Sequence, residues 1–423
     1  MDRTIIPGAV EGEVDPPSSK SYAQRAIAAA LLADGTSVLS GIEMCDDTAA
    51  ALRVVQALGA KVENPGPGTC AITGGGPDPK SYTLDIGESG LSTRLFTPIA
   101  ALSHAPITIA GHGTILTRPM EMMLDPLREL GVEVADNKGR LPITVRGPMR
   151  GGEVEIDGSV SSQFLTGLLV ALPLATSDTT VRVRNLRSIP YIDMTIDMMD
   201  RFGVDVDHRD YEEFYIPGSQ TYTPAALTIE GDWSAASCLL VAGATASRAG
   251  VTVRNLNPVS LQADVAIVEA LSRAGARIEQ TGNTITVSHR ELRAFTFDAT
   301  DCPDLFPALA ALAASCEGTS TIIGTSRLTH KESNRAEAIR SEYGKTGIEV
   351  DLSEPDTMCI TGGPIGGGVK VDSHGDHRMA MSLAVTGLNA SRPVTILGAG
   401  CVSKSYSDFW TDFDRLRIVN RAN

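Results

Sequence analysis

A helical pattern that ends on a glycine and continues into a strand pattern recurs five times along the chain. In each copy, apolar residues at helical spacing precede the glycine, and Val or Ile alternating with polar residues follows it. Glycine at this position is typical of a helix that ends in the left-handed conformation. The five residues stand at intervals of 72, at Gly59, Gly131, Gly203, Gly275 and Gly347. The 423 residues therefore predict about six copies of one α/β unit.

A second marker has the same period. Short turns rich in Ser, Gly and Asp open Ala/Leu-rich helices near residues 18, 90, 161, 233, 304 and 376. Several of these helices are apolar almost all round, which is typical of buried helices; they cover residues 23–33, 164–175, 235–246, 305–315 and 379–388. Solenoid repeats are usually about 20–50 residues long. The longer repeat found here therefore indicates a small subdomain with two helices and several strands.

The repeats divide the chain into two domains. Three copies precede residue 230 and three follow it. We expect one domain over residues 14–230 and a second formed by residues 1–13 with 231–423, so that the N-terminal strand joins the last three repeats. Because ligand sites favour domain interfaces, we expect a substrate cleft between the two domains.

Composition and charge narrow the class of protein. The net charge of −15 disfavours nucleic acid or an anionic membrane as a partner. No apolar run reaches the roughly 18 residues that a membrane helix needs, and residues 1–4 lack the layout of a signal peptide. Seven cysteines without a Cys-x-x-Cys pair fit a reducing compartment and argue against zinc or disulfides. We therefore expect a cytoplasmic protein.

Basic residues gather at or near the turns that open the repeat helices. Such turns suit anions, because they present backbone N–H groups and the positive end of the helix dipole. Each cation alone is typical of a solvated surface, but the set at equivalent turns favours a cleft for a multiply charged anion. The glycine motifs of nucleotide-binding loops are absent. The residues are Lys20, Arg25, Arg94, Arg118, Lys331, Arg335, Arg378 and Lys404.

Three acidic residues lie among these cations. Asp304, Glu332 and Asp376 each suit a helix N-cap or the first turn of a helix, a common structural role. Next to lysines in an anion cleft, they also suit general acid/base chemistry. His374 and His377 have a spacing that metal sites use, but no third ligand is evident, so we expect neither a metal nor an organic cofactor.

The order of short motifs resembles the 3-phosphoshikimate 1-carboxyvinyltransferase (EPSP synthase) family. The most specific pair is Ser159-Val160-Ser161-Ser162-Gln163-Phe164 with Asp376-His377-Arg378-Met379-Ala380. The others, in order, are Pro17-Ser18-Ser19-Lys20-Ser21-x-x-x-Arg25, Gly87-x-Ser89-Gly90-x-x-x-Arg94, Arg118-Pro119-Met120, Ser188-Ile189-Pro190-Tyr191-Ile192-Asp193, Gly231-Asp232-x-Ser234, Pro303-Asp304, Lys331-Glu332-x-x-Arg335 and Cys401-Val402-Ser403-Lys404. Together they span essentially the whole chain.

The resemblance implies an α/β enolpyruvyl transferase fold, with two domains of three βαβαββ units each that close over the substrates. It also implies the reaction of chorismate and aromatic amino-acid biosynthesis, in which phosphoenolpyruvate gives its enolpyruvyl group to the 5-hydroxyl of shikimate 3-phosphate. The products are 5-enolpyruvylshikimate 3-phosphate and phosphate, formed through a tetrahedral intermediate. The resemblance further implies a monomer.

By the same resemblance, each functional position can be assigned to a substrate. The residues expected to contact shikimate 3-phosphate are Lys20, Ser21, Arg25, Ser161, Ser162, Gln163, Ser188, Tyr191, Asp304 and Lys331. Those expected at phosphoenolpyruvate are Lys20, Gly90, Arg94, Arg118, Gln163, Arg335, Arg378 and Lys404. In the chemistry, Asp304 resembles the base for the hydroxyl. Glu332 and Lys20 are candidates for the proton at C3, and Lys331 and Lys404 for hydroxyl or phosphate contacts.

One loop departs from the family pattern. The phosphoenolpyruvate loop usually reads Gly-Asn-Ala/Ser-Gly-Thr, whereas here it reads Gly87-Glu88-Ser89-Gly90-Leu91. A carboxylate that pointed inward would repel phosphate. Ser92 or Thr93 are candidates to supply the missing hydroxyl.

Three other functions compete with this interpretation. UDP-N-acetylglucosamine enolpyruvyl transferase shares the fold and the donor, but it should carry a catalytic Cys in a loop that corresponds to residues 111–123, where this chain has none. A non-catalytic anion-binding homologue is disfavoured by the intact Lys20, Asp304, Glu332 and Lys404. An RNA phosphate cyclase is disfavoured by the acidic charge and the absence of nucleotide-binding features.

Overall fold

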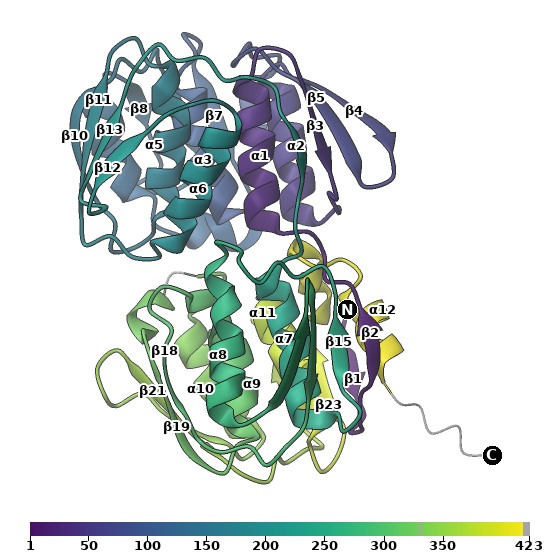
Figure 1. The fold of residues 1–423 in the computed structure, drawn as a ribbon. Helices are drawn as coiled ribbons and strands as arrows, with labels where there is room; N and C mark the ends of the chain where they lie inside the picture. The colour runs from purple at the N-terminus through teal and green to yellow at the C-terminus, as the bar shows by residue number, and fades with distance from the viewer. Residues whose placement is uncertain (330, 418–423) are drawn as a thin grey trace. The chain divides into compact units, whose positions relative to one another are not determined.

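A computed structural model describes residues 1–329 and 331–417 of the chain. The chain forms two compact units, a central unit of Ser18–Ile229 and a terminal unit of Met1–Pro17 with Glu230–Asn423. The sequence places these boundaries after residues 13 and 230; the structure has them after Pro17 and Ile229. Figure 1 shows both units as α/β structures.

One sheet topology recurs through the described residues. In each four-stranded sheet, a parallel pair is followed by two antiparallel strands; the orders are β14-β3-β5-β4, β6-β7-β9-β8, β10-β11-β13-β12, β2-β15-β17-β16 and β18-β19-β21-β20. The sixth sheet, β22-β23-β1, keeps the parallel pair and takes its antiparallel strand from the N-terminus. The predicted fold of repeated βαβαββ units is therefore confirmed.

The central unit contains three of these sheets. Its helices are α1 (Lys20–Leu32), α2 (Asp46–Ala57), α3 (Gly90–Ala100), α4 (Leu124–Glu129), α5 (Gln163–Ala171) and α6 (Pro190–Arg201), with 3-10 turns η1 (Gly113–Thr117), η2 (Glu121–Met123) and η3 (Leu172–Leu174). Its strands are β3 (Thr36–Ser40), β4 (Lys61–Gly66), β5 (Thr69–Thr73), β6 (Thr83–Asp85), β7 (Ile107–Ala110), β8 (Glu133–Ala135), β9 (Ile143–Arg146), β10 (Gly152–Asp157), β11 (Thr179–Arg184), β12 (Asp207–Arg209), β13 (Glu213–Ile216) and β14 (Ala226–Thr228).

The terminal unit contains the other three. Its helices are α7 (Trp233–Ala246), α8 (Ile267–Ala274), α9 (Phe306–Ala314), α10 (Arg335–Lys345), α11 (His377–Leu388) and α12 (Phe409–Leu416), with 3-10 turns η4 (Ala263–Ala266), η5 (Pro303–Leu305), η6 (Thr325–Arg327) and η7 (Ala399–Lys404). Its strands are β1 (Arg3–Ile5), β2 (Gly12–Val14), β15 (Val251–Val253), β16 (Arg277–Thr281), β17 (Thr284–Ser288), β18 (Thr296–Asp298), β19 (Gly318–Ile323), β20 (Glu349–Asp351), β21 (Thr357–Gly362), β22 (Lys370–Asp372) and β23 (Val394–Leu397).

The five repeat glycines have the backbone conformation that the sequence predicts. All have positive φ, from 75° at Gly203 to 111° at Gly59. Each lies just beyond the end of α2, α4, α6, α8 or α10, and a strand begins within four residues. A residue other than glycine is strained at such φ values, which explains why glycine recurs there.

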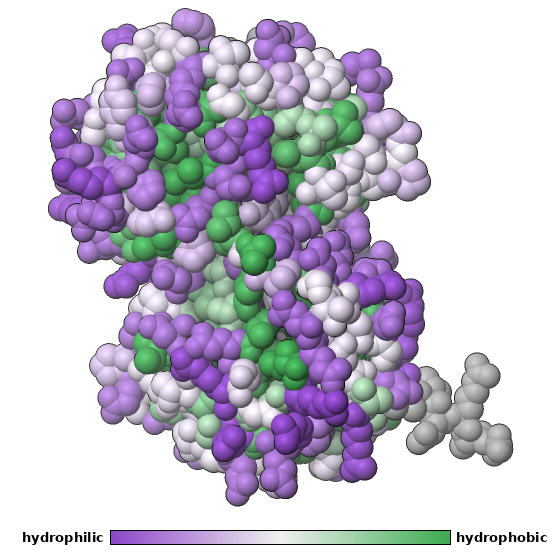
Figure 2. Space-filling view, viewed as in Figure 1, coloured by the Kyte–Doolittle hydropathy of each residue, from purple (hydrophilic) through white to green (hydrophobic). Residues whose placement is uncertain are grey.

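The apolar helices form the centre of each unit. In the central unit α1, α3 and α5 pack together, and in the terminal unit α7, α9 and α11 do so, while the sheets lie outside them (Figure 1). All residues of α9 and α11 are buried, as the apolar pattern predicts. Hydrophilic and intermediate side chains cover most of the face of each unit in Figure 2, with hydrophobic ones between them. Among the described helices, none combines the length and apolar character that crossing a bilayer requires.

These packed helices position the candidate site. Because α1, α3, α5, α7 and α11 follow turns of the repeat, the residues that begin them hold equivalent places in each unit. Ser19, Ser89, Asp232 and Asp376 cap four of these helices through their side chains. Such caps satisfy backbone N–H groups of the first turn and fix where the adjacent functional side chains start.

Candidate active site

Lys20 begins α1 and forms an ion pair in the central unit. Its Nζ lies 3.1 Å from Oδ2 of Asp47, which belongs to the first turn of α2. The two side chains are only 14% and 12% exposed, so the pair is largely shielded from water. Shielding strengthens the attraction and holds the ammonium in one place.

Arg25 lies one turn further along α1 and is fully buried. Its guanidinium donates to the Thr195 hydroxyl at 2.9 Å and to the backbone oxygens of Ser21 and Tyr191 at 2.9 and 3.0 Å. These acceptors are neutral. Burial lowers the pKa of Arg25 to about 10. A buried cation that is held by neutral groups is costly, and an anionic ligand offsets that cost.

Three of the residues expected at phosphoenolpyruvate surround Gly90, the first residue of α3. A Cβ added at Gly90 would lie 2.5 Å from Arg118 Nη1, 3.2 Å from Arg94 Nη1 and 3.5 Å from Gln163 Oε1. Arg94 also donates to Gln163 Oε1 at 3.0 Å and to the Pro119 backbone oxygen at 3.2 Å. The structure therefore brings Gly90, Arg94, Arg118 and Gln163 together, and only a glycine leaves room for both guanidinium groups.

The remaining predicted residues of the central unit lie at three helix starts, those of α1, α5 and α6. Ser161 and Ser162 precede α5, where the Ser161 hydroxyl accepts from the Gln163 amide at 3.2 Å. Ser188 precedes α6, is buried and has φ 58°, a left-handed conformation that is uncommon for serine. Tyr191, in the first turn of α6, contributes its backbone oxygen to Arg25. Ser21 does the same, so Arg25 links three predicted positions.

Glu88, the residue that departs from the family pattern, forms bonds to the neighbouring loop. Its Oε2 accepts from the Thr114 backbone amide at 2.7 Å and from the Thr114 hydroxyl at 2.9 Å. The Thr93 hydroxyl, a candidate replacement for the missing threonine, donates to the Ser89 backbone oxygen of its own helix at 2.8 Å.

Asp304 lies in the terminal unit, in η5 before α9, and accepts hydrogen bonds from three cations. Lys331 Nζ lies at 3.2 Å and Arg335 Nη1 at 2.7 Å from Oδ1, while Arg378 Nη2 lies at 3.2 Å from Oδ2. Burial alone would raise the pKa of Asp304. The charges of Arg378, Lys331 and Arg335 outweigh it and hold that pKa well below its usual range. Asp304 therefore belongs to a cluster of charged side chains.

Arg335 is the centre of that cluster. It is fully buried and begins α10. Besides Asp304, its guanidinium donates to Asp376 Oδ2 at 2.8 Å and to Glu332 Oε2 at 2.6 Å. Burial opposes the charge, but the three carboxylates raise the pKa of Arg335 well above its usual value. A contact between Arg335 and phosphoenolpyruvate stays a prediction, and it would require Arg335 to exchange one of these bonds.

The structure confirms the predicted role of Asp376 as a helix N-cap, here of α11. Its Oδ1 accepts from the Arg378 backbone amide at 3.0 Å at the start of α11, and its Oδ2 accepts from the Ser333 hydroxyl at 3.1 Å. The same carboxylate holds Arg335, so Asp376 joins the start of α11 to the loop that carries Lys331 and Glu332.

The other cations of the terminal unit lie around this centre. Burial lowers the pKa of Lys331, with Asp304 acting in the opposite direction. For Arg378 burial also lowers the pKa, but Asp304 raises it, and the net change is upward. Lys404, at the end of η7, donates to the Gly375 backbone oxygen at 2.9 Å in the turn that precedes α11. All six predicted site residues of this unit therefore contact one another or the same turn: Asp304, Lys331, Glu332, Arg335, Arg378 and Lys404.

Comparison with known proteins decides the family. The model of the family EPSP synthase (3-phosphoshikimate 1-carboxyvinyltransferase) matches residues 5–413. The chain belongs to the EPSP synthase family. A 3-phosphoshikimate 1-carboxyvinyltransferase from Clostridium kluyveri is 39% identical over 98% of this chain and 96% of the relative. One from Methanosarcina acetivorans is 38% identical over 99% and 98%.

Solved structures agree with this assignment. The EPSP synthase of Acinetobacter baumannii superposes with a TM-score of 0.82 at 27% identity and covers 99% of this chain and 98% of that one. The enolpyruvyl transferase NikO from Streptomyces tendae, at 17% identity and a TM-score of 0.78, shares the fold. The family, fold and enzyme class expected from the motifs are thus confirmed.

Sequence reasoning missed several residues that hold the EPSP synthase family motifs in place. Asp47 pairs with Lys20, and the Thr166 and Thr195 hydroxyls accept from Arg25. The one available signal was Asp47 itself, an acid in the first turn of a helix. Its partner is 27 residues away in the chain and is set by the packing of α1 on α2.

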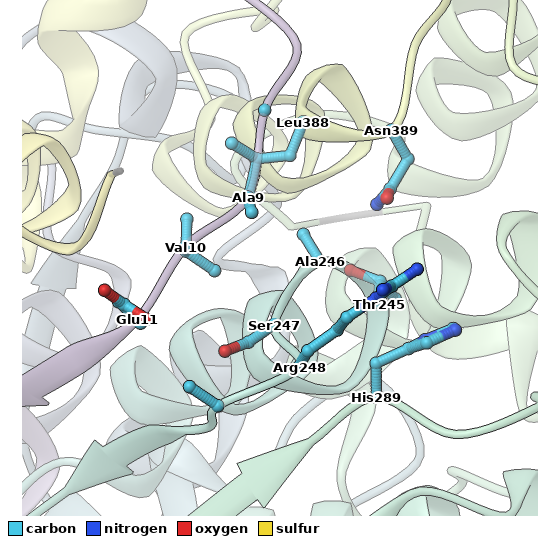
Figure 3. A pocket seen from close by; sticks show the side chains of 12 residues that line it. Ala9, Val10, Glu11, Thr245, Ala246, Ser247, Arg248, His289, Leu388 and Asn389 are labelled. Atoms are coloured by element: carbon cyan, nitrogen blue, oxygen red, sulfur yellow. The ribbon is translucent and has the colours of Figure 1, made fainter. Parts of the chain in front are cut away.

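Metal ligands and cavities add nothing to the predicted site. Among the described residues, no group of three or more His, Cys, Asp or Glu side chains is placed to hold a metal ion. A pocket of roughly 410 Å³ opens in the terminal unit between residues 8–11, the end of α7 and the end of α11 (Figure 3). Arg248, His289 and Asn389 bring polar groups to it, and none of the predicted site residues lines it.

Proposed function

We propose that this chain transfers the enolpyruvyl group of phosphoenolpyruvate to the 5-hydroxyl of shikimate 3-phosphate, with release of phosphate. The observation that carries the proposal is the family match over residues 5–413, which includes every predicted site residue. Two charge clusters support it, one around Gly90 and one around Asp304. Both substrates are anions, and both clusters contain cations: Arg94 and Arg118 around Gly90, and Lys331, Arg335 and Arg378 around Asp304.

The first step joins the acceptor to the donor. The 5-hydroxyl oxygen forms a bond to C2 of phosphoenolpyruvate, its proton passes to a base, and C3 gains a proton. The second step breaks the bond from C2 to the phosphate oxygen and removes a proton from C3. These steps need a base, an acid and cations to stabilise phosphate charge.

Asp304 is proposed as the base for the hydroxyl. With three cations around it, the carboxylate is a weak base, because its pKa lies well below the usual range. Substrate anions that pair with Lys331 and Arg378 compete for these cations. The pKa of Asp304 then rises towards the range in which a base accepts a proton efficiently. Substrate binding thus activates the base.

Protons at C3 are proposed to move through Glu332 or Lys20. Glu332 is 19% exposed and is held by Arg335 at 2.6 Å, so its carboxylate is fixed but reachable. Lys20 is held similarly by Asp47. The residues proposed to bind phosphoenolpyruvate are Lys20, Gly90, Arg94, Arg118, Gln163, Arg335, Arg378 and Lys404. Those proposed to bind shikimate 3-phosphate are Lys20, Ser21, Arg25, Ser161, Ser162, Gln163, Ser188, Tyr191, Asp304 and Lys331.

The experiment measures phosphate release from phosphoenolpyruvate with shikimate 3-phosphate or with UDP-N-acetylglucosamine. Release with the first acceptor alone supports the proposal, and release with the second alone would favour UDP-N-acetylglucosamine enolpyruvyl transferase. The absence of a Cys between residues 111 and 123 disfavours that alternative.

A parallel assay with a chelator tests the proposal that no metal is needed, and sedimentation of the purified protein tests the proposed monomer. Fractionation of the source cells tests the proposed cytoplasmic location.

A further inference from the structure

Two loops of the central unit leave the same edge of one sheet. Strands β6 and β7 pair in parallel, with Asp85 opposite Ala110, so the loops that follow them start side by side. The first loop, residues 86–89, leads to Gly90. The second, residues 111–117, leads to Arg118. Backbone bonds already join their starts, from the Ile86 amide to the Ala110 oxygen at 2.9 Å and from the His112 amide to the Gly87 oxygen at 3.0 Å.

Glu88 adds a side-chain connection between these loops. Its Oε2 accepts from both the amide and the hydroxyl of Thr114, at 2.7 and 2.9 Å. Space for the carboxylate comes from Gly113, which has φ 63° and where an added Cβ would lie 2.3 Å from Oε2. Loop geometry and residue types on both sides therefore suit a carboxylate at position 88.

The connection reaches Arg118 through one short turn. Thr114 lies in η1, the Thr117 hydroxyl donates to the Thr114 oxygen at 2.9 Å, and the Arg118 amide donates to the Ile115 oxygen at 3.2 Å. At the far end, Arg118 Nη1 approaches Gly90 closely, 2.5 Å from where a Cβ would stand. Fixing Thr114 to Glu88 thus fixes the turn that carries Arg118 relative to the turn that carries Gly90.

We propose that Glu88 is a positioning residue for Arg118, which sets the geometry of the phosphoenolpyruvate site without touching the substrate. This inference rests on the function proposed above. The carboxylate accepts hydrogen bonds from a backbone N–H and a hydroxyl of the neighbouring loop. Its charge therefore stabilises the loop and does not repel phosphoenolpyruvate. Charge-assisted bonds of this kind are the stronger ones in proteins.

The test compares three variants by steady-state kinetics with both substrates. Glu88→Ala removes the acceptor and should raise KM for phosphoenolpyruvate about tenfold, a change equivalent to about 1.4 kcal/mol. KM for shikimate 3-phosphate should stay at the wild-type value. Glu88→Gln keeps an oxygen that accepts from Thr114 but loses the charge, so it should raise KM for phosphoenolpyruvate less than Glu88→Ala does. Thr114→Ala keeps the backbone bond and should raise KM for phosphoenolpyruvate less than Glu88→Ala does.

A matched control tests whether any lost loop contact has this effect. Asp178, in the same unit, accepts from the Gly218 amide at 2.9 Å and from the Tyr215 hydroxyl at 2.7 Å, a similar pair of bonds away from Gly90. Asp178→Ala should leave both KM values unchanged. The double variant Glu88→Ala with Arg118→Ala should have about the KM of Arg118→Ala alone, because Glu88 acts through Arg118.

Three outcomes would overturn the inference. One is an unchanged KM for phosphoenolpyruvate in Glu88→Ala, or in Thr114→Ala if the former does not fold. Another is a lower KM in both Glu88→Ala and Glu88→Gln, since the charge itself would then oppose the donor. The last is additivity in the double variant. Failure of the proposed function is distinguishable, because the wild-type protein would then release no phosphate with shikimate 3-phosphate.

Discussion

At the scale of single residues, the proposed role of Asp304 as a base conflicts with its surroundings in the absence of substrate. The charges of Arg378, Lys331 and Arg335 hold its pKa well below the usual range and so make it a weak base. Arg335 is held by Asp376 and Glu332 as well, whereas the bonds of Lys331 and Arg378 to Asp304 are longer, at 3.2 Å each. Lys331 and Arg378 are therefore the partners most easily given up to a substrate.

Replacing Asp304 by Asn should reduce turnover by about 10²- to 10⁴-fold, the usual contribution of a general base. Asn keeps the size of the side chain but cannot take up the hydroxyl proton. The control is Asp298→Ala. Asp298 accepts a hydrogen bond from the Thr300 backbone amide at 2.9 Å, so this variant removes a carboxylate with a local structural role. Single-turnover assays and thermal unfolding measure both variants. Normal turnover in Asp304→Asn with reduced stability would assign Asp304 a structural role.

The same carboxylate predicts a pH dependence of stability. The folded-state pKa of Asp304 lies well below its ordinary value of 3.8, so Asp304 stabilises the fold fully above the unfolded-state pKa. This contribution should be lost as pH falls below 3.8 towards the folded-state pKa, because the unfolded chain then binds a proton that the folded chain does not. Urea unfolding from pH 7 to pH 3 should show wild type losing its advantage over Asp304→Asn only at the acidic end. An advantage that disappears already near neutral pH would contradict the assignment.

The variant Gly90→Ala tests the proposed role of the cluster that Arg94, Arg118 and Gln163 form around Gly90. The new methyl group would stand 2.5 Å from Arg118 Nη1, closer than real contacts allow, and 3.2 Å from Arg94 Nη1, which is tight, so the Arg118 guanidinium must move and that of Arg94 must shift slightly. We expect KM for phosphoenolpyruvate to rise and KM for shikimate 3-phosphate to change little. Equal changes in both constants would indicate a general distortion of the unit.

The sequence locates the candidate residues of the site, but it does not predict which side chains they contact. Motif order gives Lys20, Gly90 and Asp304, because these residues stand at helix starts that the repeat locates, and it gives Arg118 from the Arg118-Pro119-Met120 motif. It does not give the pairing of Lys20 with Asp47 or the three carboxylates around Arg335, since those depend on how helices pack. It also left the direction of Glu88 open, which depends on the neighbouring loop.

At the scale of elements, the repeat glycines and the buried helices were predictable because each follows from a local pattern. A left-handed residue between a helix and a strand favours glycine, and an apolar pattern on all sides favours burial. The exchange of strands was less local. The sheet of β3 is completed by β14 from the other end of the central unit, and β1 completes the last sheet of the terminal unit.

Two glycines near the end of α10 separate helix propensity from backbone strain. Gly344 lies within the helix and Gly347 follows it with φ 83°, and an added Cβ would meet nothing within 4 Å at either position. Gly344→Ala should stabilise the fold by up to about 1 kcal/mol. Gly347→Ala should destabilise it by about 1–2 kcal/mol, the cost of a left-handed non-glycine residue. Gly347→Asn should cost less, and chemical denaturation measures all three. Equal effects of the two alanine substitutions would refute the left-handed cap.

At the scale of the whole molecule, the residues proposed for the reaction are divided between the two units. Lys20, Arg94 and Arg118 belong to the central unit, whereas Asp304 and Lys404 belong to the terminal unit. The chain passes between the units at Pro17 and Ser18 and again at Ile229 and Glu230.

Shikimate 3-phosphate should therefore make the molecule more compact. Its phosphate and carboxylate can attract cations of both units, and binding would shift the population towards a closed form that completes the phosphoenolpyruvate site. Small-angle scattering with and without shikimate 3-phosphate should show a smaller radius of gyration in its presence. Raised salt should weaken this effect, because screening reduces the attraction between exposed charges. The control is Arg25→Ala, which lacks a proposed contact to this substrate and should need more of it for the same change. A radius that does not respond to saturating substrate would mean that the two units serve the reaction without closing.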